Sequence, residues 1–226
     1  MQIFLDTAQL AEIRNWLARG VIDGVTTNPS IMLKEGVLDV PTEVRRICAV
    51  LGERPFSVEV TTNDPDVMLE QAEEFACWAS NVVVKIPVVN EHGDPSLDVV
   101  HRLESRGIRV NATAAMSFGQ AMLAAKAGAT YVSLFWGRIA DEGHNPATVI
   151  RQTRRWLDDW GIGTRIIAGS LRGPIDVQQA ALAGSHIVTV PPAILSKLAD
   201  HKYSRYTAGE FVRAGNAVLV PAAQRV

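Results

Sequence analysis

The sequence lacks the features that would point to an extracellular or a nucleic-acid-binding protein. Its 226 residues include only two cysteines, Cys48 and Cys77, which stand far apart and outside any CxxC motif. This usage predicts reduced core residues rather than a disulfide or a metal pair. Lysine and arginine number 22 against 24 aspartate and glutamate, so the net charge is -2. Without a basic field to attract DNA or RNA, we expect no nucleic-acid partner.

Long apolar runs are also missing. No segment approaches the roughly 18 consecutive apolar residues of a membrane span. The first apolar stretch contains Asp6 and is not preceded by the basic region of a secretory signal. We therefore expect a cytoplasmic protein with no membrane partner. The five histidines show no paired ligand spacing, which disfavours a zinc-dependent enzyme. We expect no metal and no cofactor.

Short β-branched runs alternate with longer helical patterns along the chain. Eight runs are typical of strands, at 3–7, 24–28, 56–61, 82–87, 108–113, 130–136, 164–170 and 186–191. Such alternation predicts parallel strands joined by right-handed crossovers. Eight units suffice to close a (β/α)₈ TIM barrel, although the pattern also fits an open doubly wound sheet. We expect one α/β domain over 1–226, with one further helix plus an extension from about Tyr203 onward.

Lys85 stands inside the apolar stretch NVVVKIPV at 81–88, which is typical of a buried strand. Two interpretations are open. The side chain could carry its charge out to solvent along the protein surface. Alternatively, burial could disfavour the ammonium form and leave an amine able to attack a carbonyl, as in Schiff-base enzymes. Other residues of the chain are needed to choose between these two interpretations of Lys85.

A barrel of this kind places its functional side chains at the carboxyl ends of several strands. Each such polar residue could instead cap a helix or bond the local backbone. Their convergence on one mouth favours a site, because grouped polar side chains share one desolvation cost. The candidates are Asp6, Thr7, Thr26, Thr27, Asn28, Glu59, Thr61, Lys85, Asn111, Thr113, Ser133, Ser170 and Arg172.

These side chains are those that a metal-independent aldolase of class I requires. An amine that condenses with a ketone needs a proton donor and a base, and Asp6 and Glu59 supply two carboxyls for these tasks. Thr113 could help to hold a water between them. Arg138 and Arg172, with Ser133 and Ser170, offer donors for a phosphate group. The alternative for both arginines is an ordinary surface position.

Nine blocks of the chain occur in the order of the transaldolase family. They are FLDTA (4–8), DGVTTNPSIMLKEG (23–36), VEVT (58–61), VVVKIPV (82–88), NAT (111–113), QAMLAAKAGATYVS (120–133), FWGRI (135–139), AGSLR (168–172) and TVP (189–191). They resemble most the short-chain bacterial branch, which includes fructose-6-phosphate aldolase. The resemblance implies a (β/α)₈ barrel with the Schiff-base lysine at Lys85.

The resemblance also implies a role for each matching position. Asp6 would be the acid/base, and Glu59 and Thr113 would hold the catalytic water. Asn28 and Asn111, beside Thr26, would position the donor's hydroxyls. Ser133, Arg138, Ser170 and Arg172 would bind phosphate. It further implies sugar-phosphate substrates and a homo-oligomer, a pentamer or a decamer, in which the terminal helix reaches a neighbour.

Two positions separate transfer from simple cleavage. The resemblance gives fructose-6-phosphate aldolases Gln at position 59 and Tyr at position 135, where this chain has Glu59 and Phe135. Without a tyrosine to deliver a proton, the bound enamine would persist until an aldose arrives, which favours a transaldolase of the pentose phosphate pathway. A fructose-6-phosphate aldolase-like lyase and a non-catalytic sugar-phosphate-binding barrel remain as alternatives. Leu134 and Trp136 depart from the usual loop around Arg138, so we expect a non-standard acceptor, in a specialised pathway.

Overall fold

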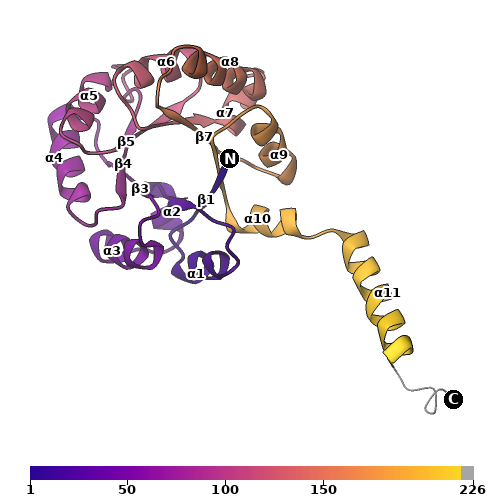
Figure 1. Cartoon of the computed structure of the whole chain (residues 1–226). Helices are drawn as coiled ribbons and strands as arrows, with labels where there is room; N and C mark the ends of the chain where they lie inside the picture. The colour runs from indigo at the N-terminus through magenta and orange to yellow at the C-terminus, as the bar shows by residue number, and fades with distance from the viewer. Residues whose placement is uncertain (220–226) are drawn as a thin grey trace.

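The computed structural model describes residues 1–219, and its centre is a closed barrel of eight parallel strands (Figure 1). Each strand pairs with its neighbours in chain order, and the last strand closes onto the first. This closure confirms the predicted (β/α)₈ barrel and excludes the open sheet. The strands are β1 (Gln2–Asp6), β2 (Gly24–Thr26), β3 (Phe56–Glu59), β4 (Val82–Pro87), β5 (Val110–Ala115), β6 (Tyr131–Phe135), β7 (Arg165–Gly169) and β8 (Ile187–Val190).

Helices surround the barrel on its outside (Figure 1). Several begin where an Asn or Asp side chain accepts a hydrogen bond from the first turn and a proline stands at the first or second helical position, which is a strong start signal. The helices are α1 (Leu10–Ala18), α2 (Pro29–Lys34), α3 (Val40–Leu51), α4 (Pro65–Ala76), α5 (Leu97–Ser105), α6 (Phe118–Lys126), α7 (Trp136–Asp141), α8 (Pro146–Asp159), α9 (Pro174–Leu182), α10 (Pro192–Ala199) and α11 (Lys202–Leu219).

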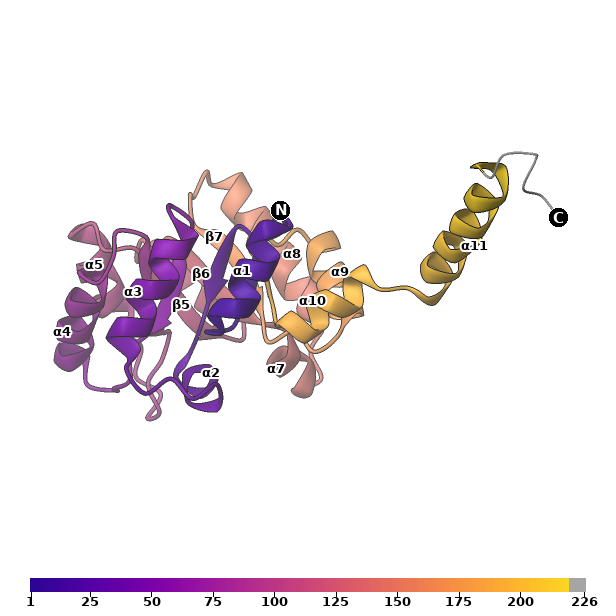
Figure 2. The same ribbon diagram turned by 90° about the horizontal axis from the view of Figure 1, so that it is seen from below.

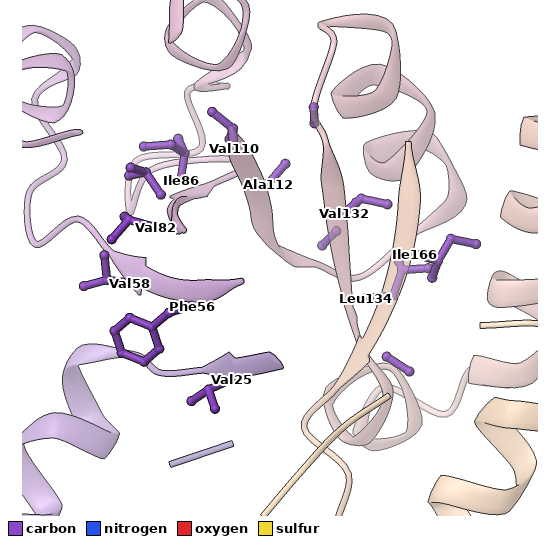
Figure 3. Packing of buried hydrophobic residues seen from close by; sticks show 14 of the residues in the cluster. Val25, Phe56, Val58, Val82, Ile86, Val110, Ala112, Val132, Leu134 and Ile166 are labelled. Atoms are coloured by element: carbon purple, nitrogen blue, oxygen red, sulfur yellow. The ribbon is translucent and has the colours of Figure 1, made fainter. Parts of the chain in front are cut away.

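Alternation along each strand separates two apolar sets. One set points outward and packs beneath the helices, and Figure 3 labels ten of its members: Val25, Phe56, Val58, Val82, Ile86, Val110, Ala112, Val132, Leu134 and Ile166. The other set forms a separate buried cluster inside the barrel, made of Phe4, Val83, Tyr131, Ile167 and Ile187. This inner cluster, called the floor below, fills the barrel beneath the polar residues of the mouth.

Gly24 belongs to the same floor. A Cβ atom at this position would lie 2.8 Å from the ring of Phe4 and 2.9 Å from the carbonyl oxygen of Pro55. No side chain fits there, so the glycine lets the Phe4 ring fill the barrel interior. Close packing at this level keeps the residues above it at the mouth.

The terminal helix α11 stands away from the barrel in both views (Figures 1 and 2). No residue from Lys202 to Val218 is buried, and its aromatic side chains Tyr203, Tyr206 and Phe211 are all exposed. The helix itself was predicted from the sequence. The extension predicted after it falls at 220–226, outside the described residues.

The cysteine prediction holds for one residue only. Cys48 lies on α3 and is buried, whereas Cys77 follows α4 and is exposed; both are free thiols. The expectation of a core position was wrong for Cys77, because Trp78, one residue on, turns inward in its place. As for the membrane, no helix within 1–219 has the length and apolarity to cross a bilayer.

Candidate active site

A cavity of about 490 Å³ opens at the carboxyl ends of the strands. It lies directly above the buried floor, because the residues two positions beyond Phe4, Val83, Tyr131, Ile167 and Ile187 all line it. The lining residues are Asp6, Thr26, Asn28, Pro29, Ser30, Glu59, Lys85, Ala114, Ser133, Phe135, Arg138, Gly169, Ser170 and Thr189. Six of the predicted site residues do not line it: Thr7, Thr27, Thr61, Asn111, Thr113 and Arg172.

Lys85 is buried, with 4% of its surface exposed. It lies on β4 at the same register position as Glu59 on β3, so the two side chains point the same way. The Nζ atom is 2.8 Å from Oε2 of Glu59 and donates a 2.8 Å hydrogen bond to the carbonyl oxygen of Thr27. The first interpretation, a side chain reaching solvent, is therefore excluded. Burial is offset by a carboxylate and a carbonyl, as a buried charge requires.

Asp6 provides a second carboxyl at the end of β1. Its Oδ1 accepts a 2.7 Å hydrogen bond from Oγ1 of Thr26, whose hydroxyl also contacts that of Thr189. Burial raises the pKa of Asp6 above its ordinary value, and this effect outweighs the hydrogen bond from Thr26 and the positive charge of Lys85. A carboxyl whose pKa is raised holds a proton to a higher pH than an ordinary aspartate does, which suits acid/base work.

The predicted residues of β5 lie behind the cavity wall. Asn111 is fully buried; it accepts a 2.7 Å hydrogen bond from Oγ of Ser133 and donates to Oγ of Ser57 at 3.4 Å. Thr113 is also fully buried, and its hydroxyl has no hydrogen-bond partner among residues 1–219. Burial of a hydroxyl without a partner costs free energy. Nε1 of Trp16 and Oγ of Ser185, which do not line the cavity, also lack a partner among the described residues.

Irregular backbone surrounds the same region. The pairing of β5 with β6 shifts register between Ala112 and Ala115, and Ala114 between them has a φ of 58°. Two strands further round the barrel, directly after β7, Ser170 has a φ of 56°. Both residues line the cavity. Non-glycine residues in the left-handed region cost energy and gather at functional sites.

Of the two arginines predicted to bind phosphate, one lines the cavity and the other does not. Arg138 on α7 lines the cavity. Arg172 does not, because its guanidinium makes two hydrogen bonds to Asp141, at 2.7 and 2.6 Å. These bonds hold the pKa of Asp141 below its ordinary value. The backbone N–H of Arg172 donates to Asp176 at 2.8 Å. No residue pattern indicates this pairing, because Asp141 lies 31 positions away along the chain.

Asn28 connects the cavity to helix α2. Its Oδ1 accepts a 2.9 Å hydrogen bond from the N–H of Ile31 and so caps the helix. The same turn brings Pro29 and Ser30 to the cavity. Within residues 1–219, no cluster of three or more His, Cys, Asp or Glu side chains is arranged to hold a metal ion.

Sequence reasoning missed two lining residues on the last strands, Gly169 and Thr189. Thr189 belongs to the TVP block at 189–191, but nothing in the block told which of its residues faces inward. The alternation of β8 would have indicated it, because Ile187 and Thr189 point the same way.

Comparisons with known proteins agree with this geometry. The chain resembles a solved thiamine phosphate pyrophosphorylase from Pyrococcus furiosus, with a TM-score of 0.57 and 13% identity over 84% of this chain and 85% of that one. It also resembles a flavocytochrome b2 variant, with a TM-score of 0.60 and 13% identity over 85% of this chain and 57% of that one. At this identity, these likenesses show the fold alone.

The sequence comparisons go further. The profile described as Transaldolase/Fructose-6-phosphate aldolase matches residues 3–218. A probable transaldolase of Dehalococcoides mccartyi is 44% identical over 89% of this chain and 91% of its own length, and one of Bacillus cereus is 46% identical over the same shares. Fold and site thus define a barrel enzyme of the aldolase class. The chain belongs to the transaldolase/fructose-6-phosphate aldolase family.

Proposed function

We propose that this chain is a transaldolase, which transfers a dihydroxyacetone unit from a ketose phosphate to an aldose phosphate through a Schiff base on Lys85. The observation that carries the proposal is the placement of the Lys85 amine. It is buried, it faces the cavity, and Glu59 lies within 2.8 Å of it. Asp6 lines the same cavity as a second carboxyl with a raised pKa.

The protons can be followed through the reaction. Lys85 passes a proton to Glu59, and the neutral amine attacks the carbonyl carbon of the ketose. The carbinolamine loses its oxygen as water when a carboxyl returns a proton, which leaves an iminium. Asp6 then removes the proton of the hydroxyl beside the bond that breaks, and the aldose leaves. The electron pair of that bond stays on the three-carbon enamine, which attacks the carbonyl of the incoming acceptor, and Asp6 returns its proton to the acceptor's oxygen. Water then adds to the iminium that results, which releases the new ketose and the free amine of Lys85.

Transfer is favoured over free cleavage by the residue beside the enamine. Phe135 lines the cavity and carries no hydroxyl that could protonate the enamine carbon. The names of the relatives, each a probable transaldolase, point the same way. The alternatives, a fructose-6-phosphate aldolase-like lyase and a non-catalytic binding barrel, predict different products from the same substrate.

Product analysis separates these alternatives. We expect the wild type to consume fructose 6-phosphate in the presence of an aldose phosphate and to release little free dihydroxyacetone in its absence. Phe135→Tyr combined with Glu59→Gln is expected to increase that release. Phe118→Tyr, on α6 outside the cavity, is the matched control. Abundant free dihydroxyacetone from the wild type would indicate a lyase, and no turnover of any ketose phosphate would indicate a binding protein.

Arg138 anchors the proposed phosphate site, with Ser133 and Ser170 beside it in the cavity wall. In this arrangement Arg172 joins the site only if it leaves Asp141. Leu134 and Trp136, which we expected to alter the mouth, are buried and do not line the cavity. A preference for a non-standard acceptor would therefore have to come from the position of α7, which begins at the buried Trp136. Equal kcat/KM values for erythrose 4-phosphate and longer aldose phosphates would contradict it.

The proposal includes a homo-oligomer, a pentamer or a decamer, acting in cytoplasmic carbohydrate metabolism. Its support is helix α11, which extends away from its own barrel (Figure 2). The helix exposes the side chains of Tyr203, Tyr206 and Phe211. An 18-residue helix with exposed aromatic side chains gains little stability alone, since most helical stability in proteins comes from packing. Packing of α11 on a neighbouring barrel would supply it.

A further inference from the structure

Glu35 closes the short helix α2 at the mouth of the barrel. The helix spans Pro29–Lys34, and Glu35 is its C-terminal cap. At its other end, Asn28, Pro29 and Ser30 line the cavity. The helix has only six residues, and Leu33 on it is 82% exposed. Its own hydrogen bonds cannot hold so short a helix in place, so its position depends on contacts at its ends.

Both carboxylate oxygens of Glu35 bind the loop that follows strand β1. Oε1 accepts a 2.8 Å hydrogen bond from the hydroxyl of Thr7, and Oε2 accepts a 2.6 Å hydrogen bond from the N–H of Ala8. Thr7 and Ala8 are buried and come directly after Asp6. Hydrogen bonds to an ionised carboxylate are the strong kind. Glu35 makes no ion pair with any cation in the described part of the chain, so these two contacts account for its carboxylate.

The contacts join two parts of the site. Thr7 is tied to β2 by its N–H, which donates to the carbonyl oxygen of Thr26 at 3.1 Å. Glu35 therefore fixes the turn that carries Asp6 and, through α2, the end that carries Asn28. A loss of this link would let the acid/base carboxyl and the substrate-binding wall move independently.

Glu35 also contributes charge to the surroundings of Asp6. The charged groups that act on Asp6 are Lys85, which favours ionisation, and Glu35 and Glu59, which oppose it. Arg138 lines the same cavity. Of the two anions, Glu59 is paired with Lys85, whereas Glu35 faces only neutral donors. Removal of the Glu35 charge should therefore make Asp6 easier to ionise.

We propose that Glu35 is a positioning residue of this site, which holds Asp6 and the Asn28 end of helix α2 in their working arrangement. Its role in turnover rests on the proposed function, whereas its effect on Asp6 does not. It touches neither the cavity nor Lys85, so it acts through Thr7 and Ala8.

The first test is carboxyl NMR of the unliganded protein with ¹³C-labelled aspartate, in which Asp6 is assigned from Asp6→Asn. We expect Glu35→Gln to lower the pKa of Asp6. Glu53→Gln is the matched control, because Glu53 is an exposed glutamate in the loop between α3 and β3, and it should leave the Asp6 titration unchanged. This measurement needs no substrate, so it tests Glu35 even if the proposed reaction is wrong.

The second test is steady-state kinetics. We expect Glu35→Gln to lower kcat by about 10- to 100-fold with little change in KM, because the acid/base group is misplaced while binding is kept. Thr7→Val keeps the charge of Glu35 and removes the hydroxyl that donates to Glu35 and accepts from the N–H of Gln9, so it should lower kcat without the fall in the Asp6 pKa. Thr7→Ser restores the hydroxyl and should recover most of kcat.

Failure of the Glu35 proposal and failure of the proposed function give different results. If Glu35→Gln and Thr7→Val both match the wild type in kcat and in the Asp6 titration, the positioning role is refuted. If Glu35→Gln does not fold, the comparison of Thr7→Val with Thr7→Ser decides, and equal kcat values for these two variants would refute it. A wild type that transfers no dihydroxyacetone would refute the proposed function alone.

Discussion

Gly137, on helix α7 next to Arg138, has no room for a side chain. A Cβ atom there would lie 2.6 Å from Nε of Arg172 and 2.6 Å from the carbonyl oxygen of Ser170. The guanidinium could move, but the carbonyl is backbone and belongs to a residue with a φ of 56°. The N–H of Gly137 also donates to that carbonyl at 3.1 Å. Gly137→Ala must therefore push α7, and Arg138 with it, away from β7.

The expected cost follows from two opposing effects. Overpacking of this kind costs about 1–3 kcal/mol, whereas a helical Gly→Ala change without a clash gains about 1 kcal/mol. We expect a net loss of up to about 2 kcal/mol in the free energy of unfolding. If the shift of α7 weakens one charge-assisted hydrogen bond to phosphate by about 1.4 kcal/mol, the Kd for phosphate rises about tenfold.

Urea denaturation and titration with inorganic phosphate measure the two effects. Gly163→Ala is the control, because nothing lies within 4 Å of its Cβ position; it should keep or slightly raise stability. The reasoning is refuted if Gly137→Ala stabilises the protein by about 1 kcal/mol, as an unhindered helical substitution would, and binds phosphate as the wild type does.

Three further predictions concern other parts of the molecule. Because burial raises the pKa of Asp6, the protonated carboxyl stabilises the folded protein fully below pH 3.8, which is the pKa of Asp6 in the unfolded chain. This stabilisation is lost as the pH rises through the pKa of Asp6 in the folded protein. Asp6→Asn should therefore be more stable than the wild type at neutral pH, and denaturation at acid pH, where the difference should vanish, checks this. Burial lowers the pKa of His186 to about 4 from 6.5, and its Nδ1 accepts a hydrogen bond from the N–H of Ile166. Wild-type stability should fall as the pH drops from 6.5 to about 4, and His186→Gln should flatten this slope in pH-dependent denaturation; an equal slope would contradict it. A chain shortened to end at Asp200 should sediment as a smaller species than the full chain, and equal masses would mean that α11 takes no part in assembly.

Much of the fold could be predicted from the sequence because the β-branched runs mark the strands clearly. The eight predicted runs each contain an observed strand or overlap it closely, and the alternation along β4 places Lys85 inside the barrel. Most residues proposed for the site follow from the same rule, since the carboxyl ends of parallel strands meet at one mouth.

What the sequence could not show depends on contacts distant along the chain. Helices α2 and α7 have six residues each, too few for a periodic signal. Arg172 follows a strand as a phosphate-binding arginine should, yet it pairs with Asp141 on α7. Asn111 and Thr113 lie behind the cavity wall next to a register shift that no residue pattern announces. The hydrogen bond from Thr7 to Glu35 joins residues 28 positions apart along the chain.

If Lys85 forms the covalent intermediate, borohydride should trap that intermediate when fructose 6-phosphate is present. Intact mass and peptide mapping would follow, with Lys85→Met as the control. We predict a three-carbon adduct on the peptide that contains Lys85 and none on the variant. A folded wild type that remains unmodified, or an adduct on another lysine, would contradict the account.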